Sequence, residues 1–440
     1  MATPENPATV FLINQYSGHG HLDTYARLYS ASFLALGYRI VLIAEKEAGI
    51  GNYLAARGGD MSKSFAFLAR SELHEPAATS RRQIRAVWQQ EGLAALSLRI
   101  GRKIVSSVLN RVEGSAIVPA VLAKRLRAWA AAVPFTTIVD EVRIASRRLQ
   151  HPPDLVFFLY LDMMSESAID CRALTRKLEA PWGGILFHPR ARGGDVDSHI
   201  ERYFLCPNAK GALLLNPHLV EPYGRALPRL TFHAAPDVTE SATLAADSSP
   251  LLRELAARAR GRTIVLQFGT LSPHKRIEDL IEVIRRADPD RYLFAIIGEI
   301  FWDAYGGDRS LQAFLDHPPE HAFVRLGFIA EEGELNALIA ASDILYAVYA
   351  DFPDSSNNLT KAAIFEKPLI VADDHLMGER VRQYRLGAAV KARDPTSILA
   401  GLEALHGRPK SDFGFAAFRD DHSETALRAT LTAAMTSWLR

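Results

Sequence analysis

The stretch TIVLQFGTLSPHKR, residues 263–276, decides the fold class. Its first part, Thr263–Phe268, is mostly β-branched or apolar and predicts a buried strand. A turn that begins with Gly269 follows, and then a helical pattern over Glu278–Arg286. A strand, turn and helix in this order are typical of a parallel α/β sheet, which binds its ligands at the carboxyl ends of its strands.

The same alternation extends in both directions from this stretch. After it we expect strands at Tyr292–Gly298, Ala322–Leu326, Ile344–Val348 and Pro368–Val371. Before it we expect strands at Thr9–Asn14, Tyr38–Ala44, Leu155–Leu161, Trp182–His188, Ala212–Asn216 and Leu230–Ala235, with a helix from Asp23 to Leu36. Small polar residues at 238–250 predict a linker. The sequence therefore predicts two doubly wound, Rossmann-like domains, at 1–237 and 251–418.

Composition narrows the class of protein. The chain has 440 residues and a net charge of +1, so it carries no overall nucleic-acid signature. Cys171 and Cys206 are its two cysteines, too few for a disulfide framework, and a reducing compartment is expected. The N-terminus is polar, so we expect no signal peptide, and no apolar run is long enough for a membrane span. We therefore expect a cytoplasmic protein.

One region is strongly basic. The stretch from Arg81 to Arg148 contains thirteen Lys/Arg and four Asp/Glu. It lies within a segment, 75–150, that we expect to be mostly helical. Such helices would suit an anionic membrane surface or a lipid-linked acceptor, and a peripheral location on the inner face of the membrane. A solvated basic face is the alternative.

The turn at residues 269–276 is the first candidate site. Lys275 would project at the carboxyl edge of the sheet, where it could neutralise a phosphate, with Arg276 beside it. The alternative is an ordinary turn with a solvated Lys-Arg pair.

The segment PDSSNNLTK, residues 353–361, is the second candidate. It would begin a helix after a strand, and free N–H groups at a helix start can bind an anion. Ser356, Asn357 and Asn358 could line a ligand there, or they could simply cap the helix.

Together these motifs resemble the C-terminal domain of the group 1 (family 4-like) glycosyltransferases, which have the GT-B fold. The family pattern G-R-L-S-P-E-K-G compares with Gly269–Arg276, and its G-K-P with Glu366-Lys367-Pro368. The order and spacing of the motifs match over residues 269–387. In the first half, Gly18–Tyr25 resembles the family's glycine-rich loop, which brings Gly18 and Gly20 to the donor. The segment that ends at His188 resembles its "T-x-H" strand, so His188 would face the transferred sugar.

The chain departs from the family on the helix of the second motif. The family's two glutamates correspond to Lys361 and to Pro353, which is next to Asp354, and its basic residue after Gly269 is Thr270. Lys361 could meet a phosphate and Asp354 could take over the sugar contact. Alternatively, Lys361 is a solvated surface residue.

The resemblance implies two domains facing across a cleft, with a last helix, 419–440, returning to the first domain. It implies transfer of a sugar from a nucleotide-sugar donor to a carbohydrate or lipid-linked acceptor, with retention of configuration and without a metal or other cofactor. We give no weight to the DxD sequence Asp195-Val196-Asp197. The alternatives are a sugar-nucleotide epimerase of the same fold and a non-catalytic nucleotide-sugar-binding protein.

Overall fold

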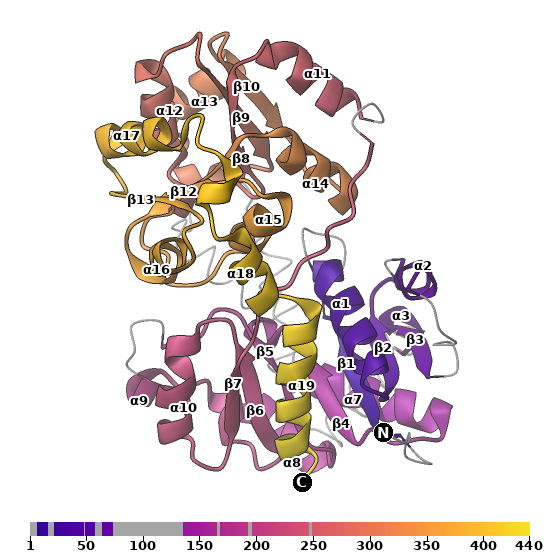
Figure 1. The fold of residues 1–440 in the computed structure, drawn as a ribbon. Helices are drawn as coiled ribbons and strands as arrows, with labels where there is room; N and C mark the ends of the chain where they lie inside the picture. Colours follow the sequence, from indigo (N-terminus) through magenta and orange to yellow (C-terminus); the bar gives the residue numbers. More distant parts are fainter. Residues whose placement is uncertain are drawn as a thin grey trace. The chain divides into compact units, whose positions relative to one another are not determined.

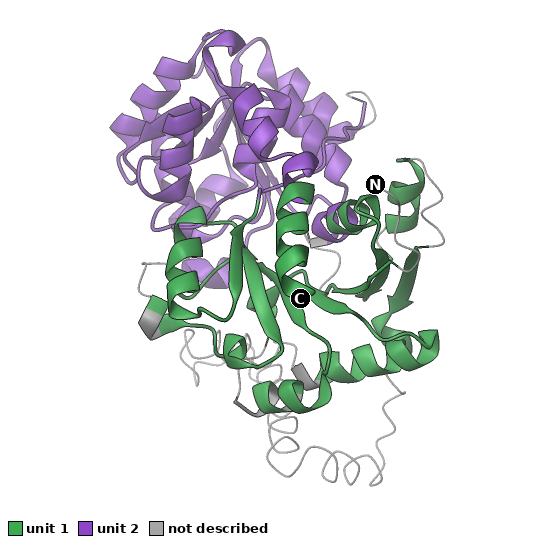
Figure 2. Ribbon diagram, turned by 60° about the horizontal axis from the view of Figure 1, so that its bottom comes forward, with its two compact units in different colours: residues 1–17, 29–235, 428–440 green, residues 18–28, 236–427 purple. Residues whose placement is uncertain are grey.

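The computed structural model describes residues 7–15, 22–47, 49–57, 64–73, 135–164, 168–191, 196–245 and 249–440. The chain forms two compact units (Figure 2). Unit 1 comprises residues 1–17, 29–235 and 428–440, and unit 2 comprises residues 18–28 and 236–427. Each unit is built around its own parallel sheet (Figure 1), so the predicted pair of α/β domains is confirmed.

The sheet of unit 1 has seven strands in the order β3-β2-β1-β4-β5-β6-β7. They are β1 (Thr9–Ile13), β2 (Arg39–Ala44), β3 (Phe65–Ala69), β4 (Leu155–Phe158), β5 (Trp182–Leu186), β6 (Ala209–Leu214) and β7 (Thr231–Ala234). All neighbouring pairs are parallel, and the direction of winding reverses between β1 and β4. The sequence predicts every strand except β3, because its FAFLA sequence lacks the β-branched residues that identify β1 and β2.

The helices that connect these strands along the chain pack on the sheet (Figure 1). They are α1 (Leu22–Ala35), α2 (Ile50–Ala55), α3 (Arg70–Leu73), α7 (Phe135–Leu149), α8 (Ala168–Lys177), α9 (Val196–His199) and α10 (Val220–Ala226). The last part of the predicted basic helical region is thus the helix α7, whereas residues 75–134 lie outside the described residues. No helix in the described ranges is both long and apolar enough to cross a membrane.

The chain returns to unit 1 at its end. Helix α19 (Glu424–Trp438) begins in unit 2, and its residues from Arg428 onward belong to unit 1. The buried indole of Trp438 covers Gly183 in β5 and donates a 2.8 Å hydrogen bond from Nε1 to Thr231 Oγ1 in β7. A Cβ on Gly183 would lie 2.6 Å from the Trp438 ring, so only glycine allows the helix to pack this closely.

The sheet of unit 2 has six strands in the order β10-β9-β8-β11-β12-β13. They are β8 (Thr263–Phe268), β9 (Tyr292–Gly298), β10 (Ala322–Leu326), β11 (Ile344–Ala347), β12 (Leu369–Ala372) and β13 (Gly387–Val390). This is the doubly wound order, with its topological switch point between β8 and β11. Five of these strands were expected, and the short GAAV sequence of β13 gave too little signal to predict it.

The helices of unit 2 lie on both faces of this sheet (Figure 1). They are α11 (Pro250–Ala259), α12 (Ile277–Arg286), α13 (Arg309–Asp316), α14 (Glu332–Ala341), α15 (Asn358–Phe365), α16 (His375–Tyr384), α17 (Pro395–Leu405) and α18 (Phe415–Asp421). Residues 236–245, at the start of the expected linker, form no helix or strand, yet Asp237 and Val238 are almost fully buried.

Candidate functional site

The two segments singled out in the second half meet at the switch point of unit 2. The turn 269–276 follows β8, the segment 348–357 follows β11, and these strands are neighbours. The Ala350 N–H donates a 2.8 Å hydrogen bond to the carbonyl of His274, and the His274 ring stacks on Phe352 with 5.1 Å between ring centroids. Ligands of doubly wound sheets bind at this point, so the fold brings both candidate segments to the expected place.

Gly269 makes room for Lys275. Its φ of +84° belongs to the left-handed region that favours glycine, and a Cβ there would lie 3.2 Å from Lys275 Nζ. The ammonium donates to the carbonyl of Phe268 at 2.8 Å and lies 5.5 Å from the centre of the Tyr349 ring. The Gln267 side chain stabilises the turn by donating a 3.2 Å hydrogen bond from Nε2 to the carbonyl oxygen of Lys275.

Lys275 is a cation without a carboxylate partner among the described residues. Burial lowers the pKa of its ammonium to about 8, because the surrounding groups solvate the charge less well than water does. An anion placed beside Nζ would restore that missing stabilisation.

Arg276 differs from Lys275. It adopts the left-handed conformation that ends the turn, with φ of +51°, and its guanidinium makes two hydrogen bonds of 2.9 and 3.0 Å to the carboxylate of Asp279. These bonds raise the pKa of Arg276 and use one edge of its guanidinium. Only its remaining N–H groups could reach a ligand.

The second segment is hydrogen-bonded to Asp237, which follows the point at Pro236 where the chain passes from unit 1 to unit 2. Asp237 is 2% exposed, and its carboxylate accepts hydrogen bonds from Tyr25 Oη (2.8 Å), Ser355 Oγ (3.1 Å) and Asn357 Nδ2 (3.2 Å). Its carbonyl accepts a 2.6 Å hydrogen bond from Thr360 Oγ1. The Asn357 amide therefore serves this internal network and makes no capping bond at the start of α15.

Two further buried residues complete the Asp237 network. Arg380 in α16 donates to Ser355 Oγ at 2.6 Å, and Nδ1 of His422 accepts the Asp237 N–H at 2.9 Å. Burial, assisted by the charge of Arg380, lowers the pKa of His422 to about 4. Asp237 and His422 were not predicted as site residues, because they lie far apart in the chain and match no motif.

The other predicted residues of this segment divide into buried and accessible side chains. Asn358 is buried and donates to Tyr349 Oη at 2.8 Å, so Tyr349 lies between Asn358 and Lys275. Asp354 is also buried, at 2% exposure, whereas Ser356 remains partly exposed at the start of α15. The partly exposed Ser356 hydroxyl and the Lys275 ammonium are thus the side-chain groups here best able to meet a ligand.

Lys361 lies in the interior of unit 2. Its ammonium is paired with the carboxylate of Glu332 and donates to Asn336 Oδ1 at 2.6 Å, both in α14. The alternative that Lys361 is a solvated surface residue is wrong, because its side chain is 3% exposed. An apolar flank on α15 had made a surface position plausible, but α15 is covered by α14 on the lysine side as well.

In unit 1, His188 follows β5 at the carboxyl edge of the sheet. Its side chain is exposed, and its N–H donates to Asp162 at 2.6 Å. The second carboxylate oxygen of Asp162 accepts the Phe187 N–H at 3.0 Å. Burial raises the pKa of Asp162, although the N–H groups of His188 and Phe187 and the charge of His188 oppose that shift. Asp162 therefore fixes the backbone that presents His188, a role that no sequence motif indicated.

The predicted glycine-rich loop and the DxD sequence remain untested. Gly18, Gly20 and Asp195 lie outside the described residues. The described chain leads up to the loop at Gln15, whose carbonyl accepts a 3.0 Å hydrogen bond from the buried Arg70. Among the residues that are described, no three or more His, Cys, Asp or Glu side chains are grouped so as to hold a metal ion.

Comparison with solved structures identifies the architecture. Anabaena HepE, in complex with UDP and glucose, superimposes with a TM-score of 0.60 at 13% identity, covering 98% of this chain and 100% of that one. Sucrose-phosphate synthase from Thermosynechococcus elongatus gives 0.59 at 12% identity, covering 98% and 97%. WaaG, a glycosyltransferase involved in lipopolysaccharide biosynthesis, gives 0.51 at 12% identity, covering 98% and 99%.

These likenesses span the whole chain. No protein-family model matches the sequence, and no curated protein matches it. At identities this low the likeness concerns the fold, which is the GT-B fold of glycosyltransferases, as predicted.

Proposed function

We propose that the protein is a glycosyltransferase that moves a sugar from a nucleotide-sugar donor to an acceptor. The observation that carries this proposal is the Lys275 ammonium, half-buried at the switch point of unit 2 and without a carboxylate partner among the described residues. The diphosphate of a nucleotide sugar is the anion that suits it, and neighbours of the same fold support this choice.

The chemistry follows from where charge develops. When the bond between the sugar and the diphosphate breaks, negative charge gathers on the leaving phosphate. A fixed cation at that position stabilises the transition state more than the ground state, which accelerates the reaction. Lys275 would supply this charge, together with the free N–H groups of Arg276 and the first N–H groups of α15 near Ser356.

The donor would therefore bind unit 2, and the acceptor would bind unit 1. His188, which is exposed at the carboxyl edge of its sheet, is the residue that we assign to the transferred sugar. We propose retention of configuration and no metal, with Lys275 in the role that a cation plays in metal-dependent transferases. The HepE complexes with UDP and UDP-glucose favour a uridine nucleotide as the first donor to test.

The acceptor is proposed as a carbohydrate or a lipid-linked sugar. The basic residues at 81–127 support an anionic acceptor or membrane surface by their charge alone, because they lie outside the described residues. Asp354 and Lys361 are assigned no direct contact with the donor in this proposal, since both side chains are buried and Lys361 is already paired with Glu332.

Calorimetric titration with UDP tests the donor site. Replacing Lys275 by alanine removes a charge-assisted hydrogen bond and should weaken UDP binding by about 10- to 100-fold, which corresponds to about 1.5–3 kcal/mol. Lys367→Ala is the matched control, because Lys367 is also half-buried with a pKa lowered by burial, but it precedes β12 at the opposite edge of the sheet. Equal UDP affinity in a folded Lys275→Ala variant and the wild type would refute the assignment.

Incubation with UDP-glucose separates the three classes of activity. Release of UDP together with transfer of glucose to water or an added acceptor identifies a transferase. Conversion to a second nucleotide sugar without release of UDP identifies an epimerase. Binding without either product identifies a non-catalytic protein.

A further inference from the structure

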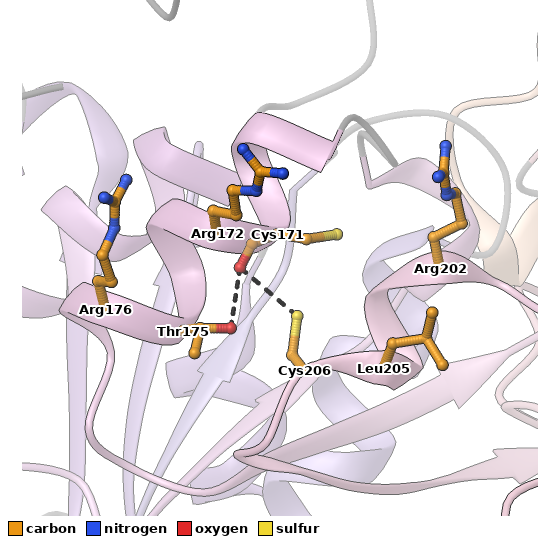
Figure 3. A pocket seen from close by; sticks show the side chains of 7 residues that line it. All are labelled: Cys171, Arg172, Thr175, Arg176, Arg202, Leu205 and Cys206. Atoms are coloured by element: carbon orange, nitrogen blue, oxygen red, sulfur yellow. Dashed lines mark hydrogen bonds between the residues drawn. The ribbon is translucent and has the colours of Figure 1, made fainter. Parts of the chain in front are cut away.

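Unit 1 contains a pocket of about 390 Å³ that is lined by none of the residues assigned to the transfer reaction. Helix α8 forms one wall and the short 3₁₀ helix η3 (Arg202–Leu205), with the residue after it, forms the other. Its lining consists of Cys171, Arg172, Thr175, Arg176, Arg202, Leu205 and Cys206 (Figure 3). The volume lies within the range of sites that hold small molecules.

The lining of this pocket is mostly apolar, and its charged groups are three arginines. Arg172 and Arg176 are four residues apart on α8 and so share one face of the helix, while Arg202 lies opposite them on η3 (Figure 3). Among the described residues, none pairs with any of these three guanidinium groups. Positive charges on both walls of one pocket favour the binding of an anion.

The walls of the pocket are held in place. Thr175 Oγ1 donates to the Cys171 carbonyl at 3.0 Å, and the Cys206 thiol contacts the same carbonyl at 3.6 Å. On the other wall, Arg229 donates to the Cys206 carbonyl at 2.8 Å and to that of Phe204. A site whose backbone is fixed in advance loses less entropy when it binds a ligand.

We propose that this pocket binds a small phosphorylated molecule. Guanidinium groups recognise phosphate oxygens through paired hydrogen bonds, and three of them match a phosphate ester that carries two negative charges. Leu205, which is 63% exposed, and the two thiols would contact the uncharged part of the ligand. This site is separate from the proposed donor site, because Lys275 belongs to unit 2.

The Cys206 thiol also lines this pocket, although it is only 4% exposed. Its pKa is lowered to about 7, chiefly by the side chain of Cys171 and then by Thr175 and Arg229, while burial opposes the shift. A phosphate bound beside Cys206 would disfavour its thiolate and raise this pKa.

The test is calorimetric titration at pH 7. Glucose 6-phosphate and inorganic pyrophosphate are the probes, and glucose is the uncharged control. We expect both phosphates, and not glucose, to bind. Arg172→Gln and Arg202→Gln should each weaken binding about tenfold or more, whereas Arg147→Gln, an exposed arginine on α7, should not.

Two further arms identify the source of the phosphate and the site. Binding that is retained in Lys275→Ala excludes the donor site as its origin. Vesicles that contain phosphatidylglycerol test a lipid headgroup. Because the basic residues at 81–127 could also bind vesicles, only vesicle binding that is weakened in both Arg172→Gln and Arg202→Gln, and not in Arg147→Gln, would assign the pocket to lipid phosphate. The proposal is overturned if soluble phosphates do not bind and vesicle binding is equal in these variants and the wild type, or if soluble phosphates bind Arg172→Gln and Arg202→Gln as well as the wild type.

Discussion

The ammonium of Lys361 in α15 and the carboxylate of Glu332 in α14 form an ion pair in the interior of unit 2. Asn336, the other partner of Lys361, donates in turn to the carbonyls of Glu240 (3.1 Å) and Ala242 (2.8 Å). Lys361 stands where the glycosyltransferase pattern that the sequence resembles has a glutamate. It thus joins two helices and, through Asn336, the segment at Glu240–Ala242.

The first prediction concerns this pair. Lys361→Glu should lower the free energy of unfolding by about 3 kcal/mol or more, because it places a second carboxylate, at a buried position, beside that of Glu332. The double variant Lys361→Glu/Glu332→Lys restores opposite charges and should recover a large part of the loss. Urea unfolding of the single and double variants measures this coupling. If Lys361→Glu leaves stability unchanged and only weakens UDP binding, the lysine is a phosphate ligand and not a structural partner.

The second prediction concerns the pH dependence of donor binding. The pKa of Lys275 is about 8, so its ammonium is charged below this pH and loses its proton as the pH rises through it. UDP affinity should therefore fall between pH 7.5 and 9.5, a window in which the phosphates of UDP do not titrate. Calorimetry across this window is the measurement. Lys275→Arg keeps its charge and should bind UDP with little pH dependence, and a fall of equal size in that variant would contradict the assignment.

The third prediction concerns acid sensitivity through His422. The folded-state pKa of about 4 lies below the usual value of 6.5, so the unfolded chain binds the proton more readily. The contribution of His422 to stability is thus complete above pH 6.5 and is lost as the pH falls toward 4. Between pH 7 and pH 5 this group should remove about 2 kcal/mol from the free energy of unfolding.

His422→Gln is the control variant for this dependence of unfolding free energy on pH. Glutamine has an amide oxygen that can accept the Asp237 N–H but no group that titrates in this range. The variant should lose less stability than the wild type between pH 7 and pH 5, as measured by urea unfolding at both values. Parallel pH profiles for the two proteins would exclude His422 as the source.

The fourth prediction concerns the packing of α19. Gly183→Ala should destabilise the protein by about 1–3 kcal/mol, because its Cβ would overlap the buried ring of Trp438. Gly224→Ala is the matched control in the same unit, since a Cβ there meets nothing within 4 Å. The control should be neutral or slightly stabilising, as expected for alanine within a helix. The measurement is the melting temperature of both variants in thermal unfolding. Equal melting temperatures for Gly183→Ala and Gly224→Ala would show that Trp438 moves aside at little cost in stability.

The fold was predictable because its strands are long apolar runs that alternate with helices and turns. Such patterns depend on local sequence, and Thr263–Phe268 was expected with its observed bounds. Glycines were informative where the backbone requires them, as at Gly269. The strand β3 was missed because its residues FAFLA include no β-branched side chain, and β13 because its four residues GAAV give little apolar signal.

The environment of the site was less predictable than its location. Sequence placed Lys275 at a sheet edge, but its lack of a carboxylate partner depends on which residues surround it in three dimensions. Lys361 illustrates the same difficulty, since its partner Glu332 lies 29 residues earlier in the chain. Asp162 and Asp237 act through hydrogen bonds to residues far away in the sequence, and no spacing rule connects them.

The contact between Trp438 and Gly183 also ties the packing of unit 1 to a residue that is translated after unit 2. Most residues of unit 1 precede Pro236, and these residues leave the ribosome first. Trp438 follows only after residues 236–427 of unit 2 have been translated. Until then Gly183 and the Thr231 hydroxyl lack the indole that covers them. Part of the sheet of unit 1 therefore stays uncovered while unit 2 is synthesised.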